Sequence, residues 1–365
     1  MKLLYVIEHI STVGGLERIL IDKMNALAAE EGFQIVLMTV WQDKASPAFP
    51  LDRRIEQVCL GVKRPASALG MLAAMPRVLY IYNNKVRAIA PDVVIHFRAI
   101  GAMLTAFSSW KGYTVFEAHT ARPHSNHRWL YPFMERKADA VVCLTKGDAM
   151  NYPKARRVEV IPNFTDAGSA NSPKSYSSQN SCLFVGRLSP QKNPLRLLRM
   201  WKDIVAKHPN WVLDIYGTGE LEERVRAEIV RLGIDNSVIM HGYTKDMAQV
   251  YAGAEMLLLC SHTEGLPMVV MEAMRYGLPV VSTDCQYGPA DMIENGKNGF
   301  LVTQNDDEAF VNAVSALMAD EALRVKMGKR ARDISSRYSK HNIVGIWKNF
   351  FLSLWDRPRI FPPQR

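Results

Sequence analysis

The chain has 365 residues and a net charge of +9, with 48% hydrophobic and 22% charged residues. This balance is typical of a soluble globular protein and excludes disordered, collagen-like and disulfide-scaffold classes, while the length favours two domains. No uncharged apolar run approaches the ~20 residues of a transmembrane helix. Five scattered cysteines without a Cys-x-x-Cys pair predict a reduced, cytoplasmic compartment and no zinc site.

The basic excess lies mostly in the first half of the chain. Residues 1–165 hold 21 basic and 14 acidic residues, whereas residues 166–365 hold 24 and 22. Such a surface suits nucleic acid, anionic lipid or a phosphorylated substrate, or it only keeps the protein in solution. The basic residues are dispersed and not interleaved with aromatic ones, which argues against a nucleic-acid binder.

Apolar runs alternate with amphipathic stretches along the first half. Strands are predicted over residues 3–7, 34–39, 92–96, 113–117 and 140–144, and helices over 16–30 and from about residue 99. Val/Ile-rich runs without polar alternation are typical of strands that are covered on both faces. This order predicts a doubly wound parallel sheet.

A second α/β series follows a stretch rich in Ser, Asn and Gly at residues 166–180. Strands are predicted over 182–185, 212–216, 237–240, 256–260 and 279–282, with a helix over 194–205. We therefore predict an N-terminal domain over 1–164, a second α/β domain over 165–341 and a tail over 342–365.

The tail carries apolar residues at helical spacing between residues 342 and 355. One interpretation is a helix that packs back on the N-terminal domain. The other is a membrane-surface helix, assisted by three basic residues that follow it: Arg357, Arg359 and Arg365.

Two predicted turns carry glycines beside a helix start. Gly14 and Gly15 lie between the first strand and the first helix, where unpaired N–H groups and a close backbone suit a phosphate. Gly186 and Arg187 follow the strand at 182–185, and Lys192 precedes the next helix. Two cations at such a position suit a diphosphate, although solvated surface charges would look the same.

A third element runs from Glu264 to Glu272. Glu264 follows a predicted strand, Pro267 is predicted at the first helical position, and Glu272 lies more than one turn inside that helix. Carboxylates accept hydrogen bonds from sugar hydroxyls, and the first N–H groups of the helix suit a phosphate. His119 also follows a strand. All these residues lie at carboxyl ends of strands, where ligands of open α/β sheets bind.

Together the Gly14-Gly15 turn, His119, Gly186-Arg187, Lys192 and the Glu-x7-Glu element resemble the family-4 retaining glycosyltransferases in order and spacing. The resemblance covers nearly the whole chain. It implies the GT-B fold, in which two Rossmann-like doubly wound domains face a central cleft. The runs 263–273 and 282–289 resemble the bacterial surface-polysaccharide and lipid-linked oligosaccharide enzymes of that family, which often use UDP-hexoses or UDP-N-acetylhexosamines.

The resemblance also implies roles for individual residues. Arg187 and Lys192 would bind the donor diphosphate, Glu272 the ribose, and Glu264 the donor sugar, while His119 would contact the sugar near the reacting centre. The other implied donor contacts are Gly14, Gly15, Gly186, Tyr243 beside the base, Gly265, Leu266, Pro267, Met268 and Val269. Many relatives have Phe-Gly before the leucine that corresponds to Leu266, and this chain has the shorter form.

Metal independence and a front-face mechanism are expected. The chain has no Asp-x-Asp to hold a metal on the diphosphate, and no carboxylate nucleophile is evident in the first domain. The nucleotide sugar would be a co-substrate and no cofactor is expected. Two alternatives stay open, a non-catalytic nucleotide-sugar-binding protein and a same-fold enzyme such as an epimerase or an inverting transferase.

The acceptor is expected to be a glycan, lipid-linked, so that the enzyme would work in the cytoplasm at the inner face of a membrane. Basic residues of the first domain would attract anionic lipid. The candidates are Arg53, Arg54, Lys63, Arg64, Arg77, Lys85 and Arg87.

Overall fold

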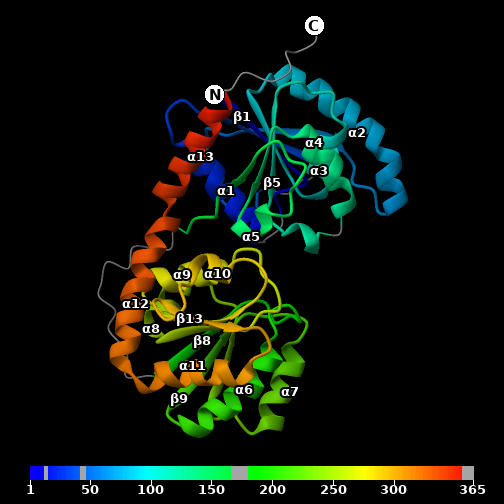
Figure 1. The fold of residues 1–365 in the computed structure, drawn as a ribbon. Coiled ribbons are helices and arrows are strands. Elements are labelled where there is room, and N and C mark those ends of the chain that lie inside the picture. Colours follow the sequence, from blue (N-terminus) through cyan, green and yellow to red (C-terminus); the bar gives the residue numbers. More distant parts are fainter. Residues whose placement is uncertain (12–14, 42–46, 126, 166–179, 356–365) are drawn as a thin grey trace. The chain divides into compact units, whose positions relative to one another are not determined.

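The computed structural model describes residues 1–11, 15–41, 47–125, 127–165 and 180–355. The chain forms two compact units, which we call unit 1 (Met1–Pro162 with Ile343–Arg365) and unit 2 (Asn163–Asn342). The chain therefore passes twice between the units, and the C-terminal helix belongs to unit 1 from Ile343 onward (Figure 1).

Within the described residues, unit 1 holds a seven-stranded parallel sheet in the order β3-β2-β1-β4-β5-β6-β7. Its strands are β1 (Lys2–Ile7), β2 (Gln34–Trp41), β3 (Glu56–Val62), β4 (Val93–Phe97), β5 (Tyr113–Ala118), β6 (Ala140–Cys143) and β7 (Val158–Val160). The two edge strands, β3 and β7, were not predicted from the sequence. The strand order reverses between β1 and β4, as in a doubly wound sheet.

Helices cover both faces of this sheet. They are α1 (Gly15–Ala28), α2 (Ala68–Ile89), α3 (Arg98–Phe107), α4 (Tyr131–Lys137) and α5 (Lys146–Ala149), with short 3-10 turns η1 (Arg122–His124) and η2 (Arg128–Leu130). Apolar residues of α2 and α3 pack with β1, β2, β3 and β4 in one core. The helix α2 continues through Pro76, which is exposed, and this helix was not predicted from the sequence.

Unit 2 repeats this plan with a parallel sheet of six strands among the described residues, ordered β10-β9-β8-β11-β12-β13. They are β8 (Asn180–Val185), β9 (Trp211–Tyr216), β10 (Val238–Gly242), β11 (Met256–Leu259), β12 (Val280–Asp284) and β13 (Gly299–Thr303). The prediction of two Rossmann-like doubly wound domains is therefore confirmed.

The helices of unit 2 are α6 (Pro194–Lys207), α7 (Glu222–Leu232), α8 (Met247–Gly253), α9 (Met268–Arg275), α10 (Pro289–Met292), α11 (Asp307–Ala319) and α12 (Glu321–Ser335), followed by η3 (Ser336–Tyr338). Apolar residues of α6, α7, α11 and α12 share one core with the sheet. In α6 the proline at the first helical position fixes the backbone for the helix start.

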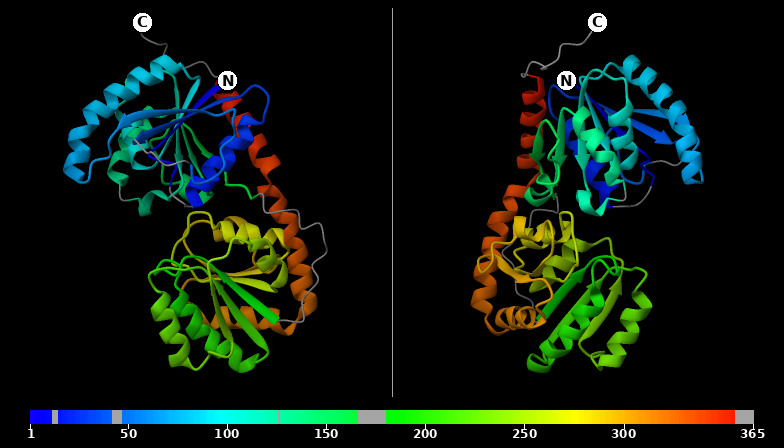
Figure 2. Two further views of the ribbon diagram at one scale, coloured as in Figure 1. Left: turned by 180° about the vertical axis from the view of Figure 1, so that it is seen from behind. Right: turned by 45° about the vertical axis from the view of Figure 1, so that its right-hand side comes forward.

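The C-terminal helix α13 (Lys340–Trp355) lies alongside α1 in unit 1 (Figure 2). Lys348 Nζ donates to Glu30 Oε2 at 2.6 Å, and the rings of Phe33 and Phe351 lie 6.2 Å apart. Six apolar residues of α13 are buried: Ile343, Val344, Trp347, Phe350, Phe351 and Leu354. This apolar face is therefore used inside the protein, which argues against the membrane-surface interpretation of the tail. Arg357, Arg359 and Arg365 lie outside the described residues.

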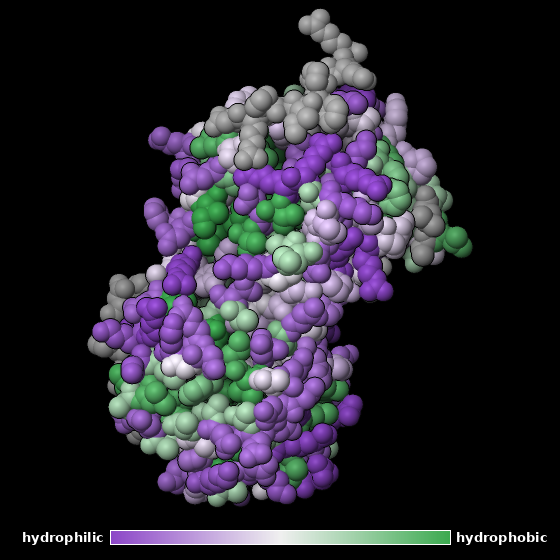
Figure 3. Space-filling model, viewed as in Figure 1, coloured by the Kyte–Doolittle hydropathy of each residue, from purple (hydrophilic) through white to green (hydrophobic). Residues whose placement is uncertain are grey.

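Hydrophilic residues cover most of the face shown in Figure 3, and hydrophobic ones lie among them in separate groups. In the described part of the chain, no helix is long and apolar enough to cross a membrane.

Candidate functional site

The turn after β8 and the loop after β11 meet at one place in unit 2. β8 and β11 are neighbours, although β9 and β10 lie between them in the chain, because the strand order reverses here. Ligands of open α/β sheets bind outside the carboxyl ends of strands at such a reversal. Gly186 follows β8 and Glu264 follows β11, so two of the three predicted loops belong to one site.

Lys192 and Glu264 form the centre of this site. Lys192 Nζ donates to Glu264 Oε1 at 2.6 Å, and Ser261 Oγ donates to the same oxygen at 2.6 Å. The Glu264 side chain is 5% exposed and that of Lys192 is 19% exposed. Among the described residues nothing donates to Glu264 Oε2, which leaves this oxygen available to a ligand hydroxyl.

Further contacts hold the two loops together. His262 N donates to Gln191 O at 2.8 Å, and Gln191 Nε2 donates to Thr263 O at 2.9 Å. Gly217, after β9, packs directly on Gly186: a Cβ at residue 217 would lie 2.0 Å from Gly186 O. Only glycine fits there, which gives this turn a structural role that the sequence did not reveal.

The two cations predicted for a diphosphate differ in their surroundings. Lys192 is paired with Glu264, whereas Arg187 is exposed and makes no ion pair with any residue the structure describes. The stem of Lys192 lies over Gly186, with its Cδ 3.7 Å from where a Cβ would be. Both side chains therefore lie at the end of β8, and Arg187 is the one that extends into solvent.

The start of α9 differs by one residue from the prediction. Pro267 has extended backbone (φ −71°, ψ 100°) and is the N-cap, and the helix begins at Met268. The N–H groups of Met268 and Val269 have no acceptor in a preceding turn, so they point out of the helix start. The side chain of Leu266 is buried, which restricts this residue to backbone contacts with a ligand.

Gly288 supports this helix start from the loop after β12. Its φ is +92°, and a Cβ there would lie 2.6 Å from Pro267 Cδ and 2.9 Å from Gly265 O. A residue with a side chain would therefore displace the segment that carries Gly265 and Leu266. The backbone of this segment is fixed by a contact that only the folded chain shows.

Glu272 is the fifth residue of α9 and is positioned by α8. Tyr251 is buried, and its hydroxyl donates to Glu272 Oε2 at 2.8 Å, while its ring stacks on Tyr276 at 5.7 Å. Tyr251 was not predicted as a site residue, since a lone tyrosine on an apolar helix face gives no signal. Tyr243 follows β10 and is 71% exposed.

The remaining predicted residues belong to unit 1. Gly14 lies outside the described residues. Gly15 begins α1, and a Cβ there would have nothing within 4 Å. His119 follows β5, and its Nε2 lies 2.8 Å from Glu117 Oε1. Lys23 of α1 in turn donates to both oxygens of Glu117. Glu117 and Lys23 were missed by the sequence analysis.

The protonation of His119 follows from its burial. Desolvation lowers the pKa of His119 below its usual range, although Glu117 acts in the opposite direction; Lys23 and Arg98 lower it further. Burial by itself raises the pKa of Glu117, but Lys23 and His119 outweigh this and hold that pKa below its usual range. His119 is therefore neutral and Glu117 ionised at pH 7.

In the described part of the chain, no group of three or more His, Cys, Asp or Glu side chains is placed to hold a metal ion. All five cysteines are free thiols.

Comparison with known proteins identifies the family. Residues 13–168 match the family described as Glycosyltransferase Family 4, and residues 169–334 match the one described as Glycosyl transferases group 1. The chain belongs to the family-4, group 1 glycosyltransferases. The family consists of retaining, metal-independent enzymes with the GT-B fold, as the resemblance of the motifs implied.

Relatives of this glycosyltransferase match along its full length. The amylovoran biosynthesis glycosyltransferase AmsD of Erwinia amylovora is 27% identical over 95% of this chain and 99% of its own. An α-1,4-N-acetyl-D-galactosaminyltransferase of Campylobacter jejuni, named for a GalNAc-containing undecaprenol diphosphate glycan, is 25% identical over 95% of this chain and 97% of its own. The structure of Anabaena HepE in complex with UDP has a TM-score of 0.77 at 21% identity, and covers 97% of this chain and 100% of the other.

Proposed function

We propose that this glycosyltransferase moves a hexose or N-acetylhexosamine from a UDP-sugar to a lipid-linked glycan acceptor in bacterial polysaccharide or oligosaccharide biosynthesis. The observation that carries the proposal is the cluster of Lys192, Glu264 and Ser261 beside the start of α9. It joins a cation, a carboxylate and unpaired N–H groups at the strand-order reversal, where open α/β sheets generally bind ligands.

The donor diphosphate would lie between the end of β8 and the start of α9. Arg187 and the ammonium of Lys192 supply two positive charges there, and the N–H groups of Met268 and Val269 supply two donors on the positive end of a helix dipole. Positive groups placed in advance stabilise the charge that develops on a departing nucleotide diphosphate. In this proposal they take the place that a divalent metal occupies in other transferases.

The two glutamates would hold the sugar parts of the donor. Glu264 Oε2 is the oxygen that a sugar hydroxyl would meet, because Oε1 already accepts from Lys192 and Ser261. Glu272 would accept from the ribose hydroxyls, in an orientation set by the Tyr251 hydroxyl. Tyr243 would lie beside the base. Each assignment requires a hydroxyl donor opposite a carboxylate, which a nucleotide sugar provides.

The transfer step would proceed on one face of the sugar. The bond from the anomeric carbon to the diphosphate oxygen breaks as the bond to the acceptor oxygen forms, and the leaving phosphate takes the acceptor proton. The products are the glycoside, with retained configuration, and the protonated nucleoside diphosphate. His119 would contact the sugar near this centre. Because His119 is neutral, it would add no positive charge beside the one that develops on the sugar.

The choice of UDP and of a lipid-linked acceptor rests on the relatives. HepE is seen with UDP, and the name of the Campylobacter enzyme includes an undecaprenol diphosphate glycan. The assignment to polysaccharide biosynthesis rests on AmsD and on these proteins.

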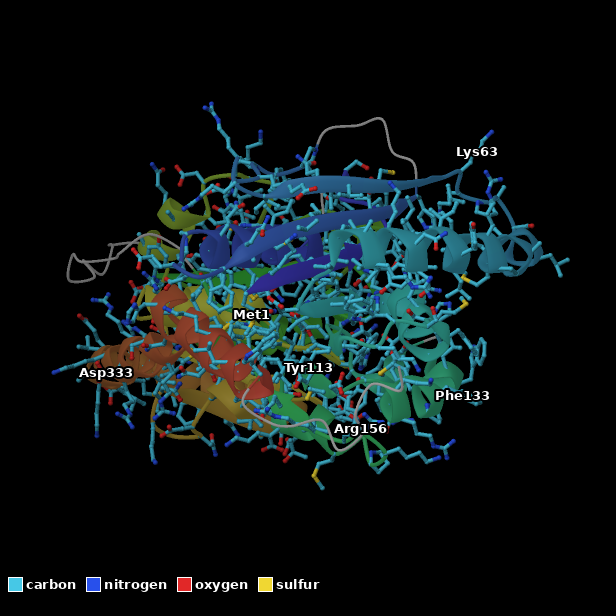
Figure 4. All side chains as sticks on the ribbon, turned by 90° about the horizontal axis from the view of Figure 1, so that it is seen from above. Met1, Lys63, Tyr113, Phe133, Arg156 and Asp333 are labelled. Carbon is cyan, nitrogen blue, oxygen red and sulfur yellow. The ribbon has the colours of Figure 1, made fainter. Side chains whose placement is uncertain are left out.

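Exposed basic and apolar residues in α2 and just before it would meet the membrane that carries such an acceptor. Lys63 and Arg64 precede α2 and Arg77 lies within it, and all three are exposed, as are Leu69 (79% exposed) and Tyr80 (70% exposed) of the same helix. In Figure 4 the Lys63 side chain extends away from the body of unit 1. Each basic residue near an anionic membrane adds about 1 kcal/mol of attraction.

Two of the other candidate residues from the sequence, Arg54 and Arg87, already contact neighbouring side chains. The guanidinium of Arg54 is bound by both oxygens of Asp52, and Arg87 donates to Ser109 Oγ at 3.0 Å. We therefore assign the membrane contact to the α2 surface, defined by Lys63, Arg64, Leu69, Arg77 and Tyr80.

The experiment that tests the function is turnover of a donor panel. The full chain is incubated with UDP-, GDP- and ADP-sugars and a lipid-linked acceptor pool, and products are read by mass spectrometry. The proposal requires a glycosylated lipid product from a UDP-sugar, formed roughly 10²–10³-fold more slowly by Lys192→Met. Donor binding without any product would favour the non-catalytic alternative, and an isomerised donor would favour an epimerase.

A further inference from the structure

A buried charge cluster lies beneath His119 in unit 1. Lys23 comes from the middle of α1 and Glu117 from β5, and their side chains are 4% and 2% exposed. Lys23 Nζ donates to both carboxylate oxygens of Glu117. Glu117 Oε1 is also the atom that lies 2.8 Å from His119 Nε2. The carboxylate thus connects a buried cation to the one predicted site residue of unit 1 that has a titratable side chain.

Three aromatic rings enclose the ammonium of Lys23. Its Nζ lies 5.4 Å from the ring centroid of Tyr5, 5.2 Å from that of Phe97 and 4.4 Å from that of Trp347. Trp347 belongs to α13, so the C-terminal helix closes the cage around this lysine. The rings stabilise the cation and exclude water, which leaves Glu117 as its hydrogen-bond acceptor.

Stability alone does not account for this arrangement. Removing two charges from water costs several kcal/mol per ion, and a well-packed apolar pair is often as stable as a buried ion pair. The contact between Glu117 and His119 gives the Lys23–Glu117 ion pair an effect beyond its contribution to stability. An ionised carboxylate only accepts, so His119 Nε2 must carry the hydrogen that it donates to Glu117 Oε1.

The other ring nitrogen of His119 is then an acceptor. Because His119 is neutral, its Nδ1 carries a lone pair and no hydrogen. Among the described residues nothing in the protein donates to Nδ1. The ring of Phe97, 5.8 Å from that of His119, fixes the plane of the imidazole.

The geometry points to Glu117, held in place by Lys23, as the positioning residue that fixes His119 in the tautomer whose Nδ1 accepts a hydroxyl of the donor sugar. This inference rests on the proposed function of His119 as a sugar contact and adds how that contact is set. In this inference Lys23 is a second positioning residue, the counter-ion of Glu117, and it touches no substrate.

The charged groups that face His119 determine how its pKa responds to substitution. They are Glu117 from β5, Lys23 from α1 and Arg98 at the start of α3. Lys23 lowers the pKa of His119, so Lys23→Met should raise it and move the acid limb of kcat/KM to higher pH. Glu117 raises that pKa, so Glu117→Gln should move the acid limb to lower pH. Charges that do not act on His119 would move neither limb.

The experiment compares the full-length enzyme with Glu117→Gln, Lys23→Met and the double variant, which carries no buried charge at these positions. Glu255→Gln is the matched control, because Glu255 and Arg324 form a buried ion pair in unit 2 with side chains 2% and 7% exposed. We expect Glu117→Gln and the double variant to lose about 10²-fold in kcat, the scale for one mis-set hydrogen-bond partner. Glu255→Gln should lose stability without that loss.

A second readout reports the tautomer directly. In ¹⁵N-histidine-labelled enzyme, with the signals assigned by His119→Gln, the unprotonated nitrogen of a neutral imidazole resonates far downfield. The wild type should show a single tautomer with hydrogen on Nε2. Glu117→Gln should show a mixture, since an amide both donates and accepts.

Two results separate failure of the inference from failure of the proposed function. If kcat, the pH profile and the tautomer all stay unchanged in Glu117→Gln and the double variant, the positioning role is wrong, whatever His119 does. If His119→Gln itself keeps wild-type kcat, the assignment of His119 as a sugar contact is wrong. A loss in Glu117→Gln no larger than in Glu255→Gln would also overturn the inference.

Discussion

Replacing Lys192 by methionine removes an ammonium but keeps a side chain of similar length over Gly186. Lys192 Nζ lies 2.6 Å from Glu264 Oε1, so the substitution removes both a proposed contact of the diphosphate and the cation beside a carboxylate that is 5% exposed. Losing one charge partner of a transition state costs roughly 10²–10³-fold in kcat, or about 2.7–4 kcal/mol.

The same substitution should lower the stability of unit 2. Glu264 Oε1 would keep only the hydrogen bond from Ser261 Oγ. A hydrogen bond to a charged group contributes about 1.5–3 kcal/mol, and 1 kcal/mol corresponds to roughly 2–4 °C in Tm for a unit of this size. We therefore expect Lys192→Met to lower both kcat and Tm, and Lys192→Met with Glu264→Gln to recover part of the Tm but none of the rate.

Arg187→Met is the matched comparison, because Arg187 is exposed and makes no ion pair among the described residues. Its stability should stay within about 0.5 kcal/mol of wild type while kcat falls by a similar factor. The assay is release of nucleoside diphosphate during transfer, with thermal unfolding measured in parallel. A loss of less than about threefold in both variants would remove the two cations from the site. A fall in Tm without a fall in kcat for Lys192→Met would make this lysine only a structural partner of Glu264.

Three further outcomes are expected. Activity should survive excess chelator, since the proposed diphosphate site relies on side-chain cations; complete loss that magnesium or manganese restores would contradict this. In vesicle sedimentation the protein should bind anionic lipid at low salt and be released at high salt, and Lys63→Gln with Arg77→Gln should weaken binding. Equal, negligible binding to neutral and anionic vesicles at both salt concentrations would refute the membrane proposal. Gly288→Ala should lower both donor affinity and Tm, because its Cβ would lie 2.6 Å from Pro267 Cδ, whereas Gly253→Ala, where a Cβ meets nothing within 4 Å, should not. Unchanged donor affinity in Gly288→Ala would show that the α9 start tolerates displacement.

Most strands that could be predicted from the sequence are covered on both faces, and the exposed edge strand β10 is an exception. β11 is an unbroken apolar run, and the predicted strand over 256–260 matches Met256–Leu259 closely. β3 was missed because it is an edge strand of which only Leu60 and Val62 are buried. β7 has three residues, all partly exposed, which is too short for a periodic pattern. α2 was missed because Pro76 interrupts a run that otherwise predicts a helix.

In the candidate site too, some residues could be predicted from the sequence and others could not. Residues that follow a strand, such as Lys192 and Glu264, are recognisable because strand ends can be predicted and because loops there carry ligand contacts. Residues that would position a site residue are harder to recognise, because their contacts are remote in the chain. Lys23 and Glu117, which lie beneath His119, are 94 positions apart. A weak signal does exist at Lys23, a charge on the buried face of α1 beside Met24.

The strand order explains why motifs so far apart in the chain form one site. Lys192 and Glu264 are 72 positions apart, and the chain between them builds α6, β9, α7, β10, α8 and β11. Those elements leave the loop after β8, extend the sheet to its edge and return on the far side of β8. The hydrogen bond between Lys192 and Glu264 therefore depends on the reversal between β8 and β11. The outer strands β9 and β10 affect this hydrogen bond chiefly through the close packing of Gly217 on Gly186. It follows that changes in the length of α7 or its loops should leave the ion pair intact, whereas a side chain at Gly217 should disturb it.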